Sequence, residues 1–214
     1  MMNTLRITEI FYSLQGETRS VGCPTVFVRL TGCPLRCHYC DTAYAFSGGT
    51  RMVLEQILQR VASYGAHYVT VTGGEPLAQP ECLTLLECLA DAGYEVSLET
   101  SGALDVAGVD PRVVKVLDLK GPSSGEAQRN CYGNIDHLLP HDQVKFVVAD
   151  EEDYQWAKAA MERYELARRC EVLFSPCAGR QNPTELADKI LRDRLPVRLQ
   201  LQLHKLLWGN EPGR

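Results

Sequence analysis

The sequence has no long hydrophobic run. None approaches the ~18 consecutive apolar residues of a membrane-spanning helix, and Met1–Ile10 lacks the apolar centre of a secretion signal. Basic residues are not in excess either, because 22 Lys and Arg stand against 27 Asp and Glu, a net charge of −5. Such a chain has no global electrostatic footprint for nucleic acid. We therefore expect a cytoplasmic protein that binds neither a membrane nor nucleic acid directly.

The 214 residues also contain no internal repeat, low-complexity tract or Pro/Gly-rich linker. Hydrophobic residues make up 45% and charged residues 23%, which is ordinary for a folded globular chain. We therefore expect a single domain over residues 1–214.

Short β-rich segments alternate with segments of helical periodicity. Strands are predicted at Pro24–Thr31, Tyr68–Thr72, Glu95–Glu99, Val113–Leu119, Gln143–Val148, Glu171–Phe174 and Val197–Leu203. Helices are predicted at Val53–Tyr64, Pro80–Ala92, Glu151–Arg168 and Thr184–Arg194, with a long loop at Gly121–Asn134. This alternation predicts an α/β fold with a mostly parallel sheet. Because a closed eightfold barrel needs about 250 residues, we expect an incomplete (βα)6-type TIM-like barrel. A doubly wound open sheet remains the alternative.

The nine cysteines are an odd number in a chain without a secretory context, which does not suit a disulfide framework. Six of them are scattered, and we interpret these as small buried hydrophobic residues. Cys33, Cys37 and Cys40 instead fall within eight positions, directly after the first predicted strand. Such crowding of thiols in a cytoplasmic protein suggests metal or redox chemistry.

Three thiolates this close can bind three corners of a cubic iron–sulfur cluster and leave the fourth iron open to a substrate or cofactor, whereas electron-transfer clusters normally have four cysteines. Two other interpretations remain. A zinc site could recruit His38 or Cys23 as its fourth ligand, although no second ligand pair is visible. The Cys37-His38-Tyr39-Cys40 segment also has the spacing of a thiol-redox motif.

The C-x3-C-x2-C spacing, with Tyr39 before the last cysteine, resembles the radical S-adenosylmethionine (SAM) superfamily. The segment Thr72–Pro76 (TGGEP), at the end of a predicted strand, resembles that superfamily's glycine-rich motif, which holds the methionine amino group of SAM. Glycines at such a strand end let a ligand approach the backbone closely.

The run Ile10–Thr18 (IFYSLQGET) resembles the opening of the 7-carboxy-7-deazaguanine synthases. The similarity continues through the segments TVFVRLTGC, CDT, ETSG, DLKGPSSG and QLHK, and so covers nearly the whole chain in order. It implies a lyase that contracts the ring of 6-carboxy-5,6,7,8-tetrahydropterin to 7-carboxy-7-deazaguanine, with loss of ammonia, in queuosine and 7-deazapurine biosynthesis. A 5′-deoxyadenosyl radical made from SAM would take the hydrogen from substrate C6.

The same resemblance implies three cofactors: a 4Fe-4S cluster, SAM and Mg²⁺. It implies a small-molecule pterin substrate, an electron donor such as flavodoxin or ferredoxin, and a homodimer. The N-terminal segment would bind substrate, and the C-terminal tail Trp208–Arg214 would cover the site.

Site residues follow from the same motifs, position by position. Cys33, Cys37 and Cys40 match the cluster ligands. The residues that match SAM-binding positions are Tyr39, Cys40, Asp41, Gly74, Asp118, Leu119, Lys120, Ser175, Pro176, Cys177 and Ala178. Those that match substrate-binding positions are Leu14, Gln15, Gly16, Arg29 and Thr72.

Two of these assignments can be argued from chemistry. The guanidinium fork of Arg29 can hold a pterin carboxylate through two hydrogen bonds. Thr42 matches the Mg²⁺ ligand and offers the oxygen that Mg²⁺ prefers, although capping by Asp41 and Thr42 would explain it equally well. Glu99 and His204 stand near predicted strand ends and receive no catalytic role. A glycyl-radical enzyme activase, which shares the cysteine spacing but not the LQGE segment, is the alternative function.

Overall fold

The computed structural model describes residues 3–209, 211 and 213. Within them the strands form one sheet of nine strands in the order β3-β1-β2-β4-β5-β6-β7-β8-β9. The strands are β1 (Thr4–Leu14), β2 (Pro24–Leu30), β3 (Thr50–Val53), β4 (Tyr68–Gly73), β5 (Glu95–Thr100), β6 (Val114–Asp118), β7 (Gln143–Val148), β8 (Glu171–Pro176) and β9 (Arg198–Leu199).

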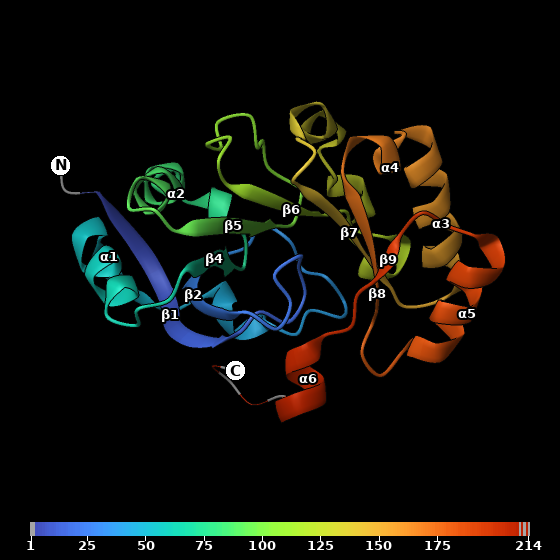
Figure 1. The fold of residues 1–214 in the computed structure, drawn as a ribbon, viewed down its shortest axis with the longest axis horizontal. Helices are drawn as coiled ribbons and strands as arrows, with labels where there is room; N and C mark the ends of the chain where they lie inside the picture. Colours follow the sequence, from blue (N-terminus) through green and yellow to red (C-terminus); the bar gives the residue numbers. More distant parts are fainter. Residues whose placement is uncertain (1–2, 210, 212, 214) are drawn as a thin grey trace.

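The sheet is parallel from β2 through β4 to β9, whereas β1 is antiparallel to both of its neighbours, β2 and β3. The order is linear, so β3 and β9 form two separate edges and the sheet does not close. Figure 1 shows the strands arranged as a curved arc. The predicted incomplete barrel with mostly parallel strands is therefore confirmed.

The helices α1 to α5 lie outside the arc, while α6 lies apart from them near the C-terminus (Figure 1). The α-helices are α1 (Leu54–Ala62), α2 (Cys82–Asp91), α3 (Glu151–Arg163), α4 (Leu166–Arg169), α5 (Pro183–Asp193) and α6 (Leu203–Trp208). Short 3₁₀-helices are η1 (Ala43–Phe46), η2 (Pro76–Ala78), η3 (Pro122–Ser124), η4 (Ala127–Arg129) and η5 (Tyr132–His137).

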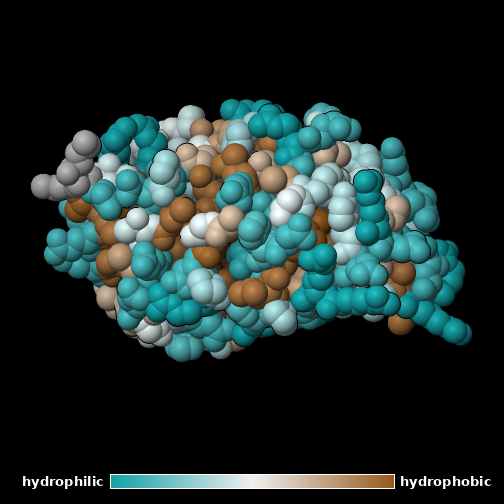
Figure 2. Space-filling model, turned by 90° about the horizontal axis from the view of Figure 1, so that it is seen from above, coloured by the Kyte–Doolittle hydropathy of each residue, from teal (hydrophilic) through white to brown (hydrophobic). Residues whose placement is uncertain are grey.

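The outer helices follow from their apolar spacing and their caps. In α1, Ile57 and Val61 lie one turn apart and both are fully buried against the sheet. The α5 helix begins where the Asn182 side chain accepts a hydrogen bond from the Thr184 amide. The hydrophobic core therefore lies between these helices and the outer face of the sheet. The face of the molecule seen in Figure 2 is mostly hydrophilic, with hydrophobic residues across its middle.

Several predicted boundaries were wrong. The helix predicted over Glu151–Arg168 divides into α3 and α4, because Glu165 has a left-handed φ of 50° that a right-handed helix cannot continue through. The strand predicted over Val197–Leu203 is only two residues long, and α6 follows it. The predicted loop at Gly121–Asn134 contains the 3₁₀-helices η3, η4 and the start of η5.

No helix in the described part of the chain is long and apolar enough to cross a membrane.

Candidate functional site

A cavity of about 870 Å³ opens at the carboxyl ends of the parallel strands. Thr72, Thr100, Asp118 and Ser175 reach its wall from the ends of β4, β5, β6 and β8. Residues of β1, β2, β7 and α6 complete the lining. Sites in parallel α/β sheets form at this edge because the loops after successive strands converge there. The cavity is therefore the candidate site.

The loop after β2 carries the three clustered cysteines into this cavity. Cys33, Cys37 and Cys40 all line it and are partly exposed. Burial is the main cause that raises the pKa of the Cys37 thiol to about 11; Lys120 opposes the rise, and the nearby Cys40 and Cys33 add to it. All three thiols thus reach the same cavity from one loop.

Glycine brings the TGGEP segment against this loop. A Cβ atom on Gly74 would lie 2.3 Å from the carbonyl oxygen of Gly32 and 2.8 Å from the Cβ of Cys33. The Glu75 amide donates to the same Gly32 carbonyl at 2.8 Å. The backbones of the two motifs are therefore in direct contact. Glycine permits this close approach because it has no side chain.

The Glu75 side chain points away from the cavity and is fully buried. Its carboxylate accepts hydrogen bonds from the Leu77 amide at 3.0 Å, the Thr100 hydroxyl at 2.9 Å, and the Ser101 amide at 2.7 Å. These bonds tie the loop after β4 to the loop after β5. The acidic residue of the motif thus holds two walls of the cavity together.

The donor set fits an iron–sulfur cluster with an open corner. No group of three or more His, Cys, Asp or Glu side chains, among the residues that the structure describes, is arranged to hold a single metal ion. Cysteines around a cubane bind different iron atoms, so they need not converge on one point. Cys23, the alternative fourth ligand, precedes β2, whereas the cysteine loop follows it. The seven residues of β2 separate them by about 23 Å at ~3.3 Å per residue.

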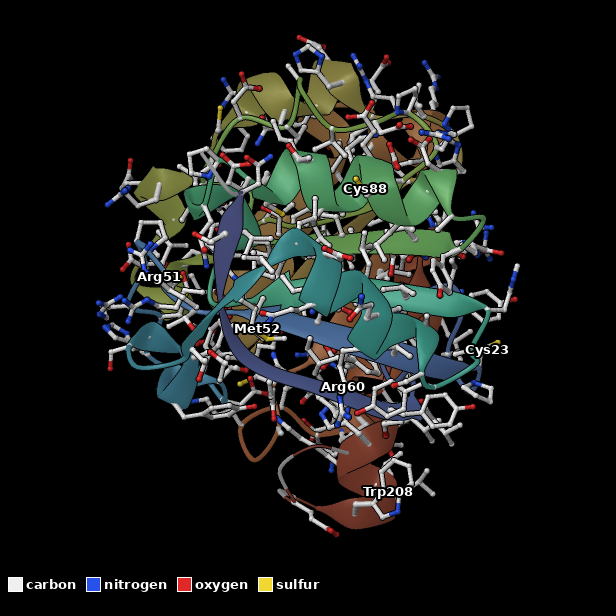
Figure 3. All side chains as sticks on the ribbon, turned by 90° about the vertical axis from the view of Figure 1, so that its left-hand side faces the viewer. Cys23, Arg51, Met52, Arg60, Cys88 and Trp208 are labelled. Atoms are coloured by element: carbon white, nitrogen blue, oxygen red, sulfur yellow. The ribbon has the colours of Figure 1, made fainter. Side chains whose placement is uncertain are left out.

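Figure 3 shows Cys23 and Cys88 on separate outer parts of the molecule. Of the six scattered cysteines, Cys82, Cys170 and Cys177 are buried. The other three, Cys23, Cys88 and Cys131, are partly exposed, so the interpretation of all six as buried residues was wrong for these.

Two buried polar atoms in the cavity wall have no hydrogen-bond partner in the described part of the chain: the Tyr39 hydroxyl and Asp118 Oδ1. The other oxygen of Asp118 pairs with Lys120 at 3.0 Å and Lys145 at 3.4 Å. Buried polar atoms are normally paired, so such orphaned groups in a cavity wall fit a polar ligand. Both belong to segments that the sequence assigned to SAM.

Nearly all other predicted SAM positions also line the cavity. Ser175, Pro176, Cys177 and Ala178 do so from the end of β8. Leu119 is the exception, because its side chain is fully buried in the core instead. Only its backbone, which bonds to the Lys145 carbonyl at 3.0 Å, lies near the strand ends.

The predicted substrate positions gather on the β1–β2 side. Leu14, Gln15, Gly16, Arg29 and Thr72 all line the cavity. Gln15 Nε2 donates to Thr70 at 3.0 Å and to Glu99 Oε1 at 3.2 Å, and the Thr72 hydroxyl donates to Glu99 Oε2 at 3.0 Å. Glu99 therefore organises two predicted substrate contacts and lies in the wall itself.

Thr42 follows Cys40 at the start of η1. It is the N-cap residue, but its side chain makes no capping hydrogen bond, so the capping explanation fails for Thr42. Its hydroxyl donates to Asp41 Oδ1 at 2.9 Å, and Asp41 Oδ2 pairs with Lys205 of α6 at 2.6 Å. The Thr42 oxygen retains lone pairs that can face the cavity, which Thr42 lines.

The segment from β9 to α6 closes over the turn after β1. The carbonyl of Gly16 accepts hydrogen bonds from the Leu203 amide at 3.1 Å and from Gln200 Nε2 at 3.3 Å. A Cβ on Gly16 would lie 2.5 Å from His204 Nδ1, so a larger residue here would require the His204 side chain to move. His204 itself lines the cavity beside Glu17.

A partly buried ion pair joins two residues of the cavity wall. Lys145 of β7 lies 3.0 Å from Glu17 Oε2. Burial alone would raise the pKa of Glu17, but attraction to Lys145 and His204 and a hydrogen bond from Gln202 lower it overall. The pKa of Glu99 is raised, first by burial and then by repulsion from Glu17. The two carboxylates thus differ in charge preference within one site.

Sequence reasoning missed several residues of the wall. Glu17 lies within the LQGE segment but was assigned no role, and Lys145 was not singled out. Phe11, Phe27 and Tyr44 also line the cavity. The LQGE motif could have indicated Glu17 as a site residue. No motif indicates Lys145, which reaches the site because β7 lies near the turn after β1.

Comparison with known proteins decides the family. Residues 27–165 match the radical SAM superfamily. The chain is 48% identical over 208 residues to the 7-carboxy-7-deazaguanine synthase of Chlorobaculum tepidum, covering 96% of this chain and 94% of that protein. The chain belongs to the 7-carboxy-7-deazaguanine synthases.

Further similarities agree with this assignment. The synthase of Koribacter versatilis is 42% identical over 224 residues, which cover 97% of this chain and 98% of that protein. The crystal structure of QueE from Escherichia coli superposes with a TM-score of 0.78 at 22% identity, over 94% of this chain and 95% of that one, and so shows the same fold. The recognised family and the predicted lyase are confirmed, and membership implies a 4Fe-4S cluster and SAM. The activase, zinc and thiol-redox alternatives are set aside.

Proposed function

We propose that this protein contracts the ring of 6-carboxy-5,6,7,8-tetrahydropterin to 7-carboxy-7-deazaguanine, with loss of ammonia, in the biosynthesis of queuosine and other 7-deazapurines. The observation that carries the proposal is the meeting, in one cavity, of the cysteine loop, the TGGEP segment and the LQGE turn. When bound, the cluster and SAM supply the radical chemistry. The chain's own residues bind, orient and shield the reactants.

We assign the residues to two sides of the cavity. Cys33, Cys37 and Cys40 would hold the cluster, and the sequence-assigned SAM residues would bind SAM beside it. Leu14, Gln15, Gly16, Arg29 and Thr72 would bind the pterin. This division is supported by the orphaned polar atoms of Tyr39 and Asp118 on one side and by the guanidinium of Arg29 on the other.

The whole chain would work as one domain. The N-terminal segment would bind substrate and the C-terminal tail would cover the site, which is supported by the bonds from Gly16 to the segment before α6. Of the tail Trp208–Arg214, residues 210, 212 and 214 lie outside the described residues.

Mg²⁺ would bind at Thr42 and share the substrate's carboxylate oxygens. Mg²⁺ usually takes few protein ligands and keeps substrate oxygens or waters in its shell. The Thr42 hydroxyl donates a hydrogen bond to Asp41, which leaves the lone pairs of its oxygen available to a cation.

Replacing Thr42 by Ala tests this ligand. We expect T42A to keep its iron and sulfide content but to lose about tenfold in Mg²⁺ affinity, the lower end for loss of a supporting group at a metal site. Turnover should be titrated with MgCl₂ against wild type. Unchanged stimulation by Mg²⁺ in T42A would contradict the assignment.

Three further properties complete the proposal. The reductant would be a small electron-transfer protein such as flavodoxin or ferredoxin. The chain would form a homodimer, to which the exposed Leu206 and Leu207 of α6 offer apolar surface. A cytoplasmic location would keep the nine free cysteines reduced.

The deciding experiment is anaerobic reconstitution with iron, sulfide, SAM, a reductant, Mg²⁺ and 6-carboxytetrahydropterin, followed by mass analysis of the product. We expect 7-carboxy-7-deazaguanine and ammonia from wild type and from the control Cys88→Ala, and no product from Cys37→Ala. A verified, reducible cluster that yields no deazaguanine would refute the substrate assignment.

A further inference from the structure

A β-bulge places an acidic residue behind the arginine of the substrate wall. Strand β1 pairs with β2 through Ile7–Leu30, but after the irregularity between Ile7 and Glu9 the next pair is Glu9–Arg29. Continuing the first register without a bulge would pair Glu9 with Val28, since β1 and β2 are antiparallel. The extra residue therefore brings Glu9 onto the strand position directly opposite Arg29.

Glu9 holds Arg29 from one side only. Arg29 Nε donates to Glu9 Oε1 at 2.7 Å, and within the described residues the two terminal nitrogens of the guanidinium make no hydrogen bond. Arg29 lines the cavity, whereas Glu9 stands behind it and is not part of the lining. The bound Nε leaves the terminal N–H groups, which can grip a carboxylate through two bonds, for a ligand.

Tyr44 completes the support. Its hydroxyl donates to the same Glu9 oxygen at 2.8 Å, and its ring and that of Phe11 each lie 5.8 Å from the guanidinium carbon. Phe11 in turn stacks on Phe27 at 4.9 Å. Tyr44 is also on η1, two residues after Thr42.

We propose that Glu9, with Tyr44, is a positioning residue that fixes the Arg29 guanidinium for the carboxylate of the pterin and so selects carboxylated over uncarboxylated ligands. This inference rests on the proposed function. It adds residues that the family motifs do not include and links the carboxylate contact to the segment that carries Thr42.

The direction of the effect separates positioning from simple charge. Glu9 is negative, so its removal makes the wall more positive, and electrostatic attraction alone would then tighten the binding of an anion. Positioning predicts weaker binding of the anion. Without the bond from Nε to Glu9 the guanidinium is mobile, and the ligand must order it again at a cost in free energy. The sign of the change in affinity therefore decides between the two.

The experiment compares two ligands on the anaerobically reconstituted holoenzyme. Equilibrium dialysis gives the dissociation constants of 7-carboxy-7-deazaguanine and of 7-deazaguanine, which lacks the carboxylate. The ratio of the two constants measures carboxylate selectivity. The variants are Glu9→Ala, Glu9→Gln, Tyr44→Phe and Arg29→Ala, with Glu55→Ala on α1 and Tyr64→Phe as matched controls outside the cavity.

We expect E9A to lose selectivity about tenfold and Y44F about threefold, within the range for loss of a typical hydrogen bond. E9Q keeps an oxygen for the same two donors and should stay within about threefold of wild type. The affinity for 7-deazaguanine should not change in any of these variants. Both control variants should keep the wild-type selectivity.

Selectivity in E9A equal to or above that of wild type would overturn the proposal, as would an equal loss in E9Q and E9A. If E9A does not fold, Y44F carries the test, and unchanged selectivity in Y44F overturns the proposal in the same way. Failure of the proposed function is distinguishable, because wild type itself would then show no preference for the carboxylated ligand.

Discussion

At the scale of single residues, Gly74 is under the tightest steric constraint in the cavity wall. The nearest atoms that its Cβ would meet are backbone atoms of Gly32 and the Cβ of Cys33, which cannot swing aside as the end of a flexible side chain could. The cysteine loop after β2 can therefore take its position only because Gly74, after the neighbouring strand β4, has no side chain.

Gly74→Ala should lower the free energy of unfolding by about 1–3 kcal/mol, as overpacking does, and reduce the iron bound on reconstitution because Cys33 is displaced. Urea unfolding and iron analysis provide the measurements. Gly133→Ala is the control, because a Cβ there meets no atom within 4 Å. A G74A protein with wild-type stability and iron content would show that the loop yields without cost.

Sequence reasoning found those site residues that sit in local motifs. Cys33, Gly74 and Gln15 are each marked by their neighbours in the chain. Glu9 and Lys145 belong to no such motif. A bulge in β1 brings Glu9 opposite Arg29, and the packing of β7 near the turn after β1 brings Lys145 to Glu17. Contacts set by register between distant strands are not visible in one sequence.

At the scale of elements, α6 is attached to the cavity mainly by polar contacts. None of its residues is buried. Lys205 pairs with Asp41 at 2.6 Å, and Gln202, just before the helix, donates to Glu17 at 3.0 Å and to Asp41 at 3.3 Å. A helix held in this way can be loosened without unfolding the sheet.

Lys205→Met should change the global free energy of unfolding by less than about 1 kcal/mol, since exposed ion pairs contribute little. Chymotrypsin should nevertheless cut within α6, at Leu206 to Trp208, about threefold faster, the factor that corresponds to ~0.7 kcal/mol of local stability. Lys189→Met, which breaks the 2.7 Å pair with Glu151 on the outer surface, is the control. Equal cleavage rates in K205M and wild type would contradict this role.

The element boundaries that sequence reasoning missed have local physical causes. Nothing in the apolar spacing of residues 151–168 announces the left-handed turn at Glu165, a residue that rarely adopts it. The apolar run near Leu203 suits a strand as well as a helix, and its short length gives no periodicity to choose between them. The central strands and outer helices, which are long and strongly patterned, were predicted correctly in type.

At the scale of the whole molecule, two carboxylates from opposite parts of the chain have pKa values displaced in opposite directions. Glu17 follows β1 and its pKa is lowered, whereas Glu99 ends β5 and its pKa is raised, chiefly by burial. A group whose pKa is lowered by folding stabilises the protein at pH values above its unfolded-state pKa. This stabilisation is lost as the pH falls through the folded-state pKa. A raised pKa instead costs stability as the pH rises and Glu99 ionises.

Glu17→Gln should therefore destabilise the protein at about pH 7 and have less effect near pH 4, where the unfolded-state carboxyl is half protonated. Glu99→Gln should stabilise it at about pH 7, and the gain should vanish near pH 4, where the wild-type carboxyl is protonated. Urea unfolding of the protein before cluster assembly gives both values. An E99Q variant less stable than wild type at neutral pH would contradict the argument.

The hydrogen bonds to the Gly16 carbonyl affect how the open side of the incomplete barrel is covered. A closed barrel is sealed all round by strand ladders, but here the turn after β1 is joined to the segment after β9 by hydrogen bonds from Gln200 and Leu203 to the Gly16 carbonyl. Breaking these few hydrogen bonds would free the segment before α6 from the cavity wall and leave the ladder of the sheet intact.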